Sequence, residues 1–253
     1  MMKTNPLVSV VIPVYSGSHL LPRAINSALE QDVPLEVIVI NDASAEDVDT
    51  VMAAYQGNVQ VVYLKNPRNM GAAESRNRGV AQAQGKYVAF LDADDCWAAG
   101  KLRKQIALLE KNGMVLCATA RELMRPDGTT MGRVISVPET ITYRDMLKHN
   151  CISCSSVLIR AEAAREFPMH HAADSHEDYI MWLEVLRKYK TACGINEPLL
   201  RYSVSTRGKS GSKFKSAAMT YRVYQHMGFS PLRSAYCFCS YAVHGVWKHY
   251  IKK

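Results

Sequence analysis

Four short apolar runs, each followed by a helical pattern, occupy the first ninety-five residues. The runs are Val8–Val14, Leu35–Ile40, Val59–Leu64 and Tyr87–Leu91. The segments 18–31 and 44–55 repeat apolar residues three and four positions apart, as helices do. A third helix is expected over residues 72–84, between the loop that contains Gly71 and a stop at Gly85. Strands that alternate with helices in this way form a parallel, doubly wound sheet. The sequence therefore predicts an α/β fold with a Rossmann-like, mostly parallel sheet flanked by helices.

The pattern loosens after the fourth run. We expect a helix at 101–111, strands at 114–120 and 155–160, a turn at 125–129, a helix at 178–190 and an extended segment at 198–204. No repeat, linker or low-complexity tract interrupts the chain. We therefore expect one domain over residues 1–213, divided into a nucleotide-binding half (1–97) and an acceptor half (98–213). A helical C-terminal extension is expected over residues 214–253.

Three carboxylates, Asp92, Asp94 and Asp95, follow the fourth apolar run directly. Open α/β sheets bind ligands at the carboxyl ends of their strands. If the backbone stays extended through Ala93, Asp92 and Asp94 point to the same side. Two such carboxylates suit Mg²⁺ or Mn²⁺, which also bind substrate phosphates. The alternative is a solvated turn or a helix cap, and capping of the next helix is the role expected for Asp95.

Further candidate residues lie at other predicted strand and helix ends. Asp42 ends the second strand, and Glu177 and Asp178 precede an amphipathic helix. Ser44 and Asp47 resemble a capping box opening the second helix. The Gly-containing loop from Asn69 could direct amides, and Arg76, at a diphosphate. Simpler alternatives are a connecting loop and an N-cap role for Asp178.

Charge and cysteine content restrict the partners and the compartment. The net charge is +8 and the pI about 9.1, which indicates an anionic partner: a nucleotide, a phosphorylated lipid, a membrane surface or nucleic acid. No acid occurs between Arg201 and Lys253. Seven cysteines without a repeating spacing indicate a reducing compartment, and Cys151-x-x-Cys154 lacks the second pair of a zinc finger. The N-terminus shows neither a spanning helix nor a signal peptide, so we expect a cytoplasmic protein.

The C-terminal tail has the pattern of an amphipathic basic helix. Its apolar positions at helical spacing are Leu232, Tyr236, Cys239, Val243, Val246, Trp247 and Tyr250. Aromatic residues and lysines on such a helix favour peripheral contact with a membrane interface. The alternative is a helix that packs on the core or on a second subunit of a homodimer.

Taken together, the motifs resemble family 2 glycosyltransferases of the GT-A fold. They are Pro13-Val-Tyr, Asn41-Asp42-Ala-Ser, Asn69-x-Gly-x-x-x-x-Arg76-Asn77-x-Gly79, Phe90-Leu-Asp-Ala-Asp-Asp95 and His176-Glu-Asp178. The resemblance covers about residues 7–203. The C-terminal segments, Phe214-x-x-x-Ala-Ala, Tyr221-Arg-Val-Tyr224 and Tyr236–Ala242, look more loosely like bacterial members that build teichuronic acid, capsule or exopolysaccharide.

The resemblance implies a role for each motif. The residues implied in nucleotide and donor binding are Pro13, Val14, Tyr15, Asp42, Asn69, Gly71, Arg76, Asp92 and Asp94. Asp94 and Asp92 would hold the metal, and Asp178 would be the general base of an inverting displacement. Glu177 and Trp97 would contact the acceptor or support the site, Trp97 being more typical of a core residue. Arg207, Lys209 and Lys213 would bind the diphosphate, although the segment 203–212 departs from the family pattern there.

The expected function is metal-dependent transfer of a hexose-type sugar from a UDP-sugar to a lipid-linked saccharide at the inner face of the membrane, in surface polysaccharide synthesis. Nucleic acid is not an expected partner. A dinucleotide oxidoreductase would need Gly-x-Gly-x-x-Gly after the first strand, and the segment from Pro13 to Gly17 does not supply it. A sugar nucleotidyltransferase would need a Gly-rich, Arg-containing loop there. A catalytically idle relative that serves as an assembly partner is the third alternative, and the intact acids disfavour it.

Overall fold

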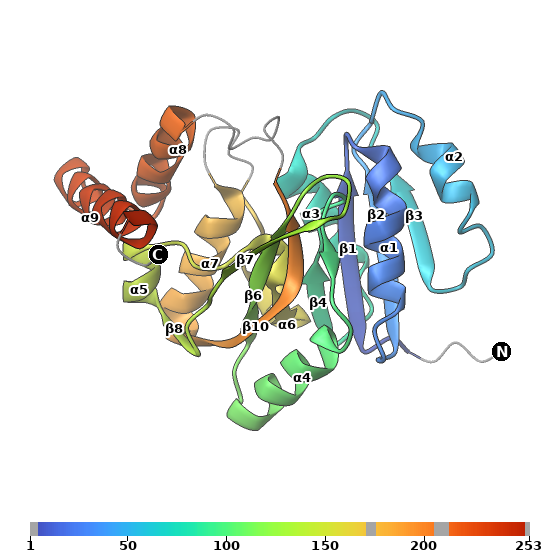
Figure 1. The fold of residues 1–253 in the computed structure, drawn as a ribbon, viewed down its shortest axis with the longest axis horizontal. Helices are drawn as coiled ribbons and strands as arrows, with labels where there is room; N and C mark the ends of the chain where they lie inside the picture. Colours follow the sequence, from blue (N-terminus) through green and yellow to red (C-terminus); the bar gives the residue numbers. More distant parts are fainter. Residues whose placement is uncertain (1–4, 171–175, 205–212, 251–253) are drawn as a thin grey trace.

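The computed structural model describes residues 5–170, 176–204 and 213–250, with backbone alone at 213–215 and 243–250 (Figure 1). A ten-stranded sheet runs through the molecule in the order β3-β2-β1-β4-β9-β6-β10-β5, with β7 paired to β6 and β8 to β10. The strands are β1 (Val8–Val14), β2 (Leu35–Asn41), β3 (Val61–Lys65), β4 (Tyr87–Phe90), β5 (Cys96–Trp97), β6 (Leu116–Met124), β7 (Thr130–Ile135), β8 (Thr140–Thr142), β9 (Leu158–Arg160) and β10 (Thr191–Ser203).

Helices cover both faces of the sheet. They are α1 (Leu21–Leu29), α2 (Val48–Ala53), α3 (Ala72–Gln82), α4 (Lys101–Asn112), α5 (Tyr143–Lys148), α6 (Ala161–Glu166), α7 (Glu177–Tyr189), α8 (Lys213–His226) and α9 (Pro231–Tyr250), with 3-10 turns at η1 (Ser18–Leu20) and η2 (Cys154–Ser156).

The amino-terminal half is parallel, as predicted. β1 lies between β2 and β4, and Val8 pairs with both Leu35 and Tyr87. Successive side chains of a strand point to opposite faces, so Val10 and Ile12 pack with α1, and Val11 packs with α3. A Cβ on Gly79 would lie 2.3 Å from a methyl carbon of Val11, so this glycine lets α3 approach β1.

The second half of the sheet is mixed, so the prediction of a mostly parallel sheet holds only for the first half. β9 pairs antiparallel with both β4 and β6, β10 is parallel to β6, and β5 and β8 are antiparallel to β10. The predicted turn at 125–129 forms and produces the antiparallel β6–β7 hairpin, with Arg125 N donating to Thr129 O at 2.8 Å. Hairpins pair strands antiparallel without a crossover helix.

Several element boundaries differ from the prediction. α2 begins after Asp47, whose Oδ1 accepts from Thr50 N at 3.0 Å, so Ser44 is not its cap. The predicted helix at 18–31 is the η1 turn followed by α1. β10 begins at residue 191 rather than 198, because Thr191–Cys193 pairs with β8, the strand pairs with β6 from Cys193 on, and Pro198 is accommodated at register shifts.

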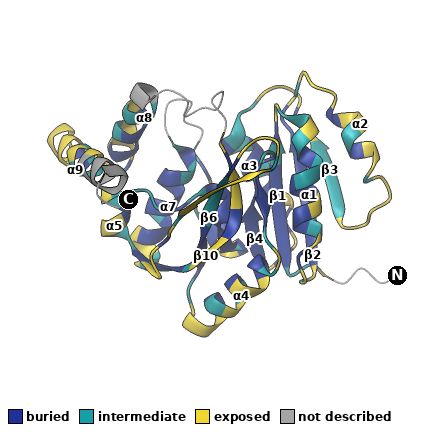
Figure 2. Ribbon diagram, viewed as in Figure 1, coloured by how far each residue is buried: buried dark blue, intermediate teal, exposed yellow. Residues whose placement is uncertain are grey.

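α8 and α9 form the red end of the ribbon and pack beside α5 and α7 (Figure 1). The Tyr224 hydroxyl of α8 donates to Leu147 O at 2.8 Å, and its ring lies 6.4 Å from that of Tyr179. On α9, Leu232 and Tyr236 are 86% and 77% exposed, and yellow marks the exposed surface of this helix in Figure 2. Packing on the core therefore accounts for part of the tail. Among the described helices, none has the length and apolarity needed to cross a membrane.

Candidate active site

A cleft of about 890 Å³ opens at the carboxyl ends of β1, β2 and β4. Its lining includes all nine residues expected to bind the nucleotide and donor: Pro13, Val14, Tyr15, Asp42, Asn69, Gly71, Arg76, Asp92 and Asp94. Their convergence follows from the parallel order of β2, β1 and β4, which brings three strand ends to one edge.

Asp42 shapes one wall of the cleft. Its Oδ1 accepts from Asn66 Nδ2 at 2.7 Å and from Met70 N at 2.8 Å, and its Oδ2 accepts from Gly71 N at 2.8 Å. Gly71 has φ of 87° and immediately precedes α3, a conformation that favours glycine. Asp42 thus anchors the loop that enters α3, and its contact with the nucleotide stays a prediction.

The acids after β4 lie in a turn rather than an extended segment. Asp95 N donates to Asp92 O at 3.1 Å, so the extended backbone that would align Asp92 and Asp94 does not form. Asp92 Oδ1 instead accepts from Arg76 Nη2 at 2.5 Å. Burial raises the pKa of Asp94, and the charge of Asp92 raises it further. Both side chains still line the cleft.

Asp95 connects this turn to β10 and does not cap a helix. α4 begins after Gly100, whereas Asp95 is buried and accepts from Ser203 N through Oδ1 at 2.8 Å. Its Oδ2 is buried without a hydrogen-bond partner among the described residues. Burial raises the pKa of Asp95 well above its ordinary value, and the charges of Asp92 and Asp94 raise it further.

The acid cluster fits a divalent cation. The pKa of Asp94 is raised partly by Asp92, and no other described residue donates a hydrogen bond to the Asp94 carboxylate. A bound cation would relieve this repulsion, and carboxylate oxygens are the ligands that Mg²⁺ and Mn²⁺ prefer. Asp94 is therefore the better placed ligand for a cation, because the Asp92 carboxylate already forms an ion pair with Arg76.

Arg76 joins the cleft to the start of α7. Its guanidinium is buried, with Nη2 on Asp92 and Nη1 3.5 Å from Glu177 Oε1. Burial raises the pKa of Asp178, and the charge of Glu177 raises it further. The charge of Arg76 partly offsets this effect. Glu177 and Asp178 are not part of the cleft lining. Arg76 therefore bridges Asp92 in the cleft and Glu177, which precedes Asp178 in the first turn of α7.

Asp178 is not the N-cap of α7. His176 occupies that position without a side-chain cap, and Asp178 lies in the first turn, where its Oδ1 accepts from Tyr179 N at 2.8 Å. The carboxylate therefore binds one first-turn amide of the helix. A raised pKa makes a carboxylate a stronger base near neutral pH.

Trp97 does not present its ring to an acceptor, because it is buried. Its Nε1 donates to Ser155 O at 2.7 Å, and Ser155 Oγ accepts from Asp92 N at 3.1 Å. Trp97 therefore supports the acidic turn. Arg207 and Lys209 lie outside the described residues, and Lys213 begins α8 with no description of its side chain.

Two further residues, Arg23 and Glu46, position the backbone of the cleft and were not predicted from the sequence. Arg23 of α1 donates to Asp94 O at 2.8 Å and to Pro126 O at 3.1 Å, linking the acidic turn to the β6–β7 hairpin. Glu46 accepts from Gly17 N and Ser18 N at 3.0 and 2.6 Å beside the cleft, and these backbone hydrogen bonds lower its pKa. No local pattern marks either residue, because their partners are distant in sequence.

Comparison with known sequences decides the family. The profile described as Glycosyl transferase family 2 matches residues 9–167, which include the whole cleft lining except Ser203. The chain belongs to glycosyltransferase family 2. It is 35% identical, over 98% of its length and 99% of the relative's, to a Bacillus subtilis protein named as the teichuronic acid biosynthesis glycosyltransferase TuaG. It is 30% identical, over 96% and 95%, to Escherichia coli WfgD, a UDP-Glc:alpha-D-GlcNAc-diphosphoundecaprenol beta-1,3-glucosyltransferase.

Solved structures confirm the GT-A fold. S. aureus TarS 1-349 in complex with UDP-GlcNAc superposes with a TM-score of 0.73 at 17% identity, covering 93% of this chain and 71% of that one. The mannosyltransferase PcManGT of Pyrobaculum calidifontis, in complex with GDP-Man and Mn²⁺, gives 0.69 at 16% identity, covering 97% and 76%. The family 2 glycosyltransferase thus belongs with enzymes of surface polysaccharide synthesis by sequence and with GT-A proteins by fold.

Proposed function

We propose that this protein is a metal-dependent, inverting glycosyltransferase that moves a hexose-type sugar from a UDP-sugar to a lipid-linked saccharide. The observation that carries the proposal is the single cleft that collects all nine expected donor residues, with Arg76 joining it to Glu177 and Asp178. WfgD and WfaP, both 30% identical to this chain, are named for UDP-Glc and an acceptor on diphosphoundecaprenol.

The donor would lie across the strand ends. Pro13, Val14, Tyr15 and the wall held by Asp42 would bind the nucleoside, and Tyr15 is 52% exposed and available for such contact. A divalent cation, held by Asp94 and Asp92, would supply positive charge to the leaving diphosphate. Arg76 is already paired with Asp92, so it would fix the orientation of that carboxylate and place positive charge beside the diphosphate.

Asp178 would take the proton from the acceptor hydroxyl. The hydroxyl oxygen forms a bond to the anomeric carbon from the face opposite the nucleotide, and the bond from that carbon to the diphosphate oxygen breaks. The bonding electrons leave with UDP, and the configuration inverts in a single displacement. Glu177, held by Arg76, would position the loop and raise the basicity of Asp178.

The acceptor would reach the site from the inner face of the membrane. Leu232 and Tyr236 lie four residues apart on α9, so both lie on one helix face, and both are exposed. Aromatic and aliphatic side chains on a helix without acids suit an interfacial contact. This contact would hold a peripheral, cytoplasmic enzyme close to a lipid-linked substrate.

The test is UDP release from a panel of UDP-sugars, with Mn²⁺ and an N-acetylglucosamine-diphospholipid acceptor. We expect acceptor-dependent UDP release with a β-linked product from an α-linked donor. Retention of configuration would exclude the inverting displacement. Absence of UDP release above the uncatalysed rate, with every donor and with or without acceptor, would instead favour an idle assembly partner.

Metal dependence is tested separately through Asp94. EDTA or Asp94→Asn should abolish transfer and weaken UDP binding in calorimetry, because the diphosphate loses its counter-charge. Glu162→Gln, which removes an exposed carboxylate of α6, is the matched control and should change neither. Undiminished transfer in EDTA would contradict the metal assignment.

A further inference from the structure

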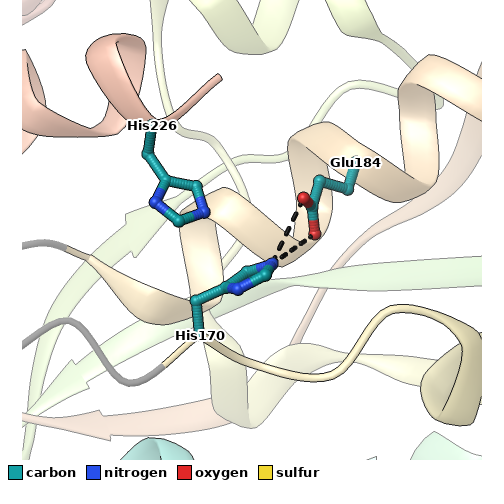
Figure 3. Close-up of side chains that lie close together, drawn as sticks. All are labelled: His170, Glu184 and His226. Carbon is teal, nitrogen blue, oxygen red and sulfur yellow. Dashed lines mark hydrogen bonds and ion pairs between the residues drawn. The ribbon is translucent and has the colours of Figure 1, made fainter. Parts of the chain in front are cut away.

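Two histidines and a glutamate meet where α7, the segment before it and the end of α8 come together (Figure 3). His170 Nε2 lies 3.1 and 3.2 Å from the two carboxylate oxygens of Glu184. The ring centroids of His170 and His226 are 4.5 Å apart. One ligand atom from each side chain lies within 4.8 Å of the others. Figure 3 shows the three side chains pointing toward a common point.

We propose that His170, Glu184 and His226 form a binding site for a divalent transition-metal ion of the Zn²⁺ type, which fastens α8 to α7. Imidazole nitrogens and a carboxylate oxygen are ordinary Zn²⁺ ligands at about 2.0–2.2 Å, which places tetrahedral ligand atoms about 3.4 Å apart. The His170–Glu184 separation already meets this spacing. His226 reaches it by a small side-chain movement, and water completes the tetrahedron.

Hydrogen bonds from α3 position His170, one of the three proposed ligands. Met169, next to His170, is held on both backbone groups by Asn77: its N donates to Asn77 Oδ1 at 2.8 Å and its O accepts from Asn77 Nδ2 at 2.7 Å. This bidentate contact fixes the backbone at His170 against α3. A metal site needs ligands whose orientation is set by such supporting contacts.

An entry path is also present. His226 is exposed, and the side chains of His170 and Glu184 are 39% and 17% exposed. The site therefore admits an ion from solvent without unfolding. Its chemistry differs from that of the cleft, where the acids offer oxygen alone and suit Mg²⁺ or Mn²⁺. The two sites can accordingly be tested with different metals.

A metal ion that links α7 and α8 should stabilise the folded glycosyltransferase. α8 is the first helix after β10, and α7 carries Glu177 and Asp178 in its first turn. An ion bound by both helices would hold α8 on α7 beyond the contact of Tyr179 with Tyr224. We expect metal binding to raise the melting temperature of the full chain, as any ligand of the folded state does.

The experiment uses the full-length protein, stripped with a chelator, desalted and kept in excess Mg²⁺ to saturate the acidic cleft. Calorimetry with ZnCl2 should show one site per chain and a matching rise in melting temperature. His226→Ala and Glu184→Gln should each weaken Zn²⁺ binding by more than about tenfold. Gln225→Ala, at the exposed neighbour on α8, is the matched control and should bind Zn²⁺ as the wild type does.

Cysteines are the competing ligands, since Cys239 is exposed. Co²⁺ substitution distinguishes them, because thiolate ligands give an intense charge-transfer absorption that nitrogen and oxygen ligands lack. We expect the wild type to form a Co²⁺ complex without this charge-transfer absorption. His226→Ala should not form that complex. Absence of Zn²⁺ binding, equal affinity in wild type and His226→Ala, or a thiolate absorption that follows occupancy would each overturn the proposal.

Discussion

At the scale of single residues, Asp178 separates catalysis from helix stabilisation. Asp178→Asn keeps an oxygen that can accept from Tyr179 N, so the first turn of α7 is retained. The amide cannot take the acceptor's proton, so kcat should fall by about 10²- to 10⁴-fold while UDP-sugar affinity changes little. Transfer assays and calorimetry on one preparation measure both. Near-normal turnover would assign Asp178 to the helix alone.

The raised pKa of Asp178 adds a pH dependence. The base must be deprotonated, so kcat/KM should fall with decreasing pH through a value above that of an ordinary aspartate. Between its ordinary and raised pKa the folded state binds more protons than the unfolded state, so this group's contribution to stability falls as pH rises. Asp178→Asn should therefore melt at or above the wild-type temperature at neutral pH. A clearly lower melting temperature would contradict this origin of the shift.

Lys101 is a fully buried lysine at the start of α4. Its Nζ donates to Gln105 Oε1 at 2.8 Å and lies 4.1 Å from the centroid of the Trp97 ring. Burial lowers its pKa to about 7. Between about pH 7 and 10 the unfolded chain then binds more protons, so the free energy of unfolding rises with pH by up to about 1.4 kcal/mol per unit.

Lys101→Met should remove that slope. Urea unfolding at about pH 7.5 and pH 9.5 measures it, since the difference between wild type and variant cancels other titrating groups. Lys111→Met, at an exposed position of the same helix, is the matched control and should keep the wild-type slope. Equal slopes in Lys101→Met and wild type would show that the amine is charged in the folded protein.

At the scale of elements, α9 has one side packed and another exposed. Cys237 and Ser234 are buried, whereas Leu232 and Tyr236 project from the surface. A double change, Leu232→Ser with Tyr236→Ser, should reduce co-sedimentation with anionic liposomes and leave the melting temperature unchanged, because no packed contact is lost.

The matched control for α9 is Val59→Ser, since Val59 is 75% exposed but lies just before β3, in the amino-terminal half of the chain. It should bind liposomes as the wild type does. A drop in melting temperature for the α9 double variant, or equal liposome binding by both variants, would assign the exposed face of α9 to another role.

At the scale of the whole molecule, Arg76 ties the two halves of the site together. Arg76→Met leaves Asp92 and Glu177 without this partner. Removal of one partner from a buried ion pair costs about 3–5 kcal/mol, and the lower end applies because the Asp92 side chain is 34% exposed. Urea unfolding should thus show a loss of about 3 kcal/mol.

Arg103→Met is the comparison, since it breaks a pair with Asp32 whose side chains are 68% and 46% exposed. Exposed pairs contribute about 0–1 kcal/mol, so a small change is expected. An equally small loss of unfolding free energy in Arg76→Met would show that solvent can replace the arginine beside Asp92 and Glu177. The stability of the folded protein would then not depend on this link.

The sequence by itself determined the fold class, the parallel half-sheet and the strand ends at which the cleft opens. This was possible because apolar periodicity follows local backbone geometry, and parallel strands bring their carboxyl ends to one edge whatever the rest of the chain does. Asp42, Asp92 and Asp94 could therefore be expected at this edge from their positions after β2 and β4 alone, and all three line the cleft.

Only the tertiary structure decided which groups contact one another across long sequence separations. The turn at Asp92–Asp95, the bond from Ser203 N to Asp95 and the contact of Arg23 with Asp94 depend on packing between distant elements. So does the cluster of His170, Glu184 and His226, whose members come from three segments. Local patterns encode the period of a helix or strand, whereas these contacts arise from the mixed half of the sheet and from helix packing, which no local spacing specifies.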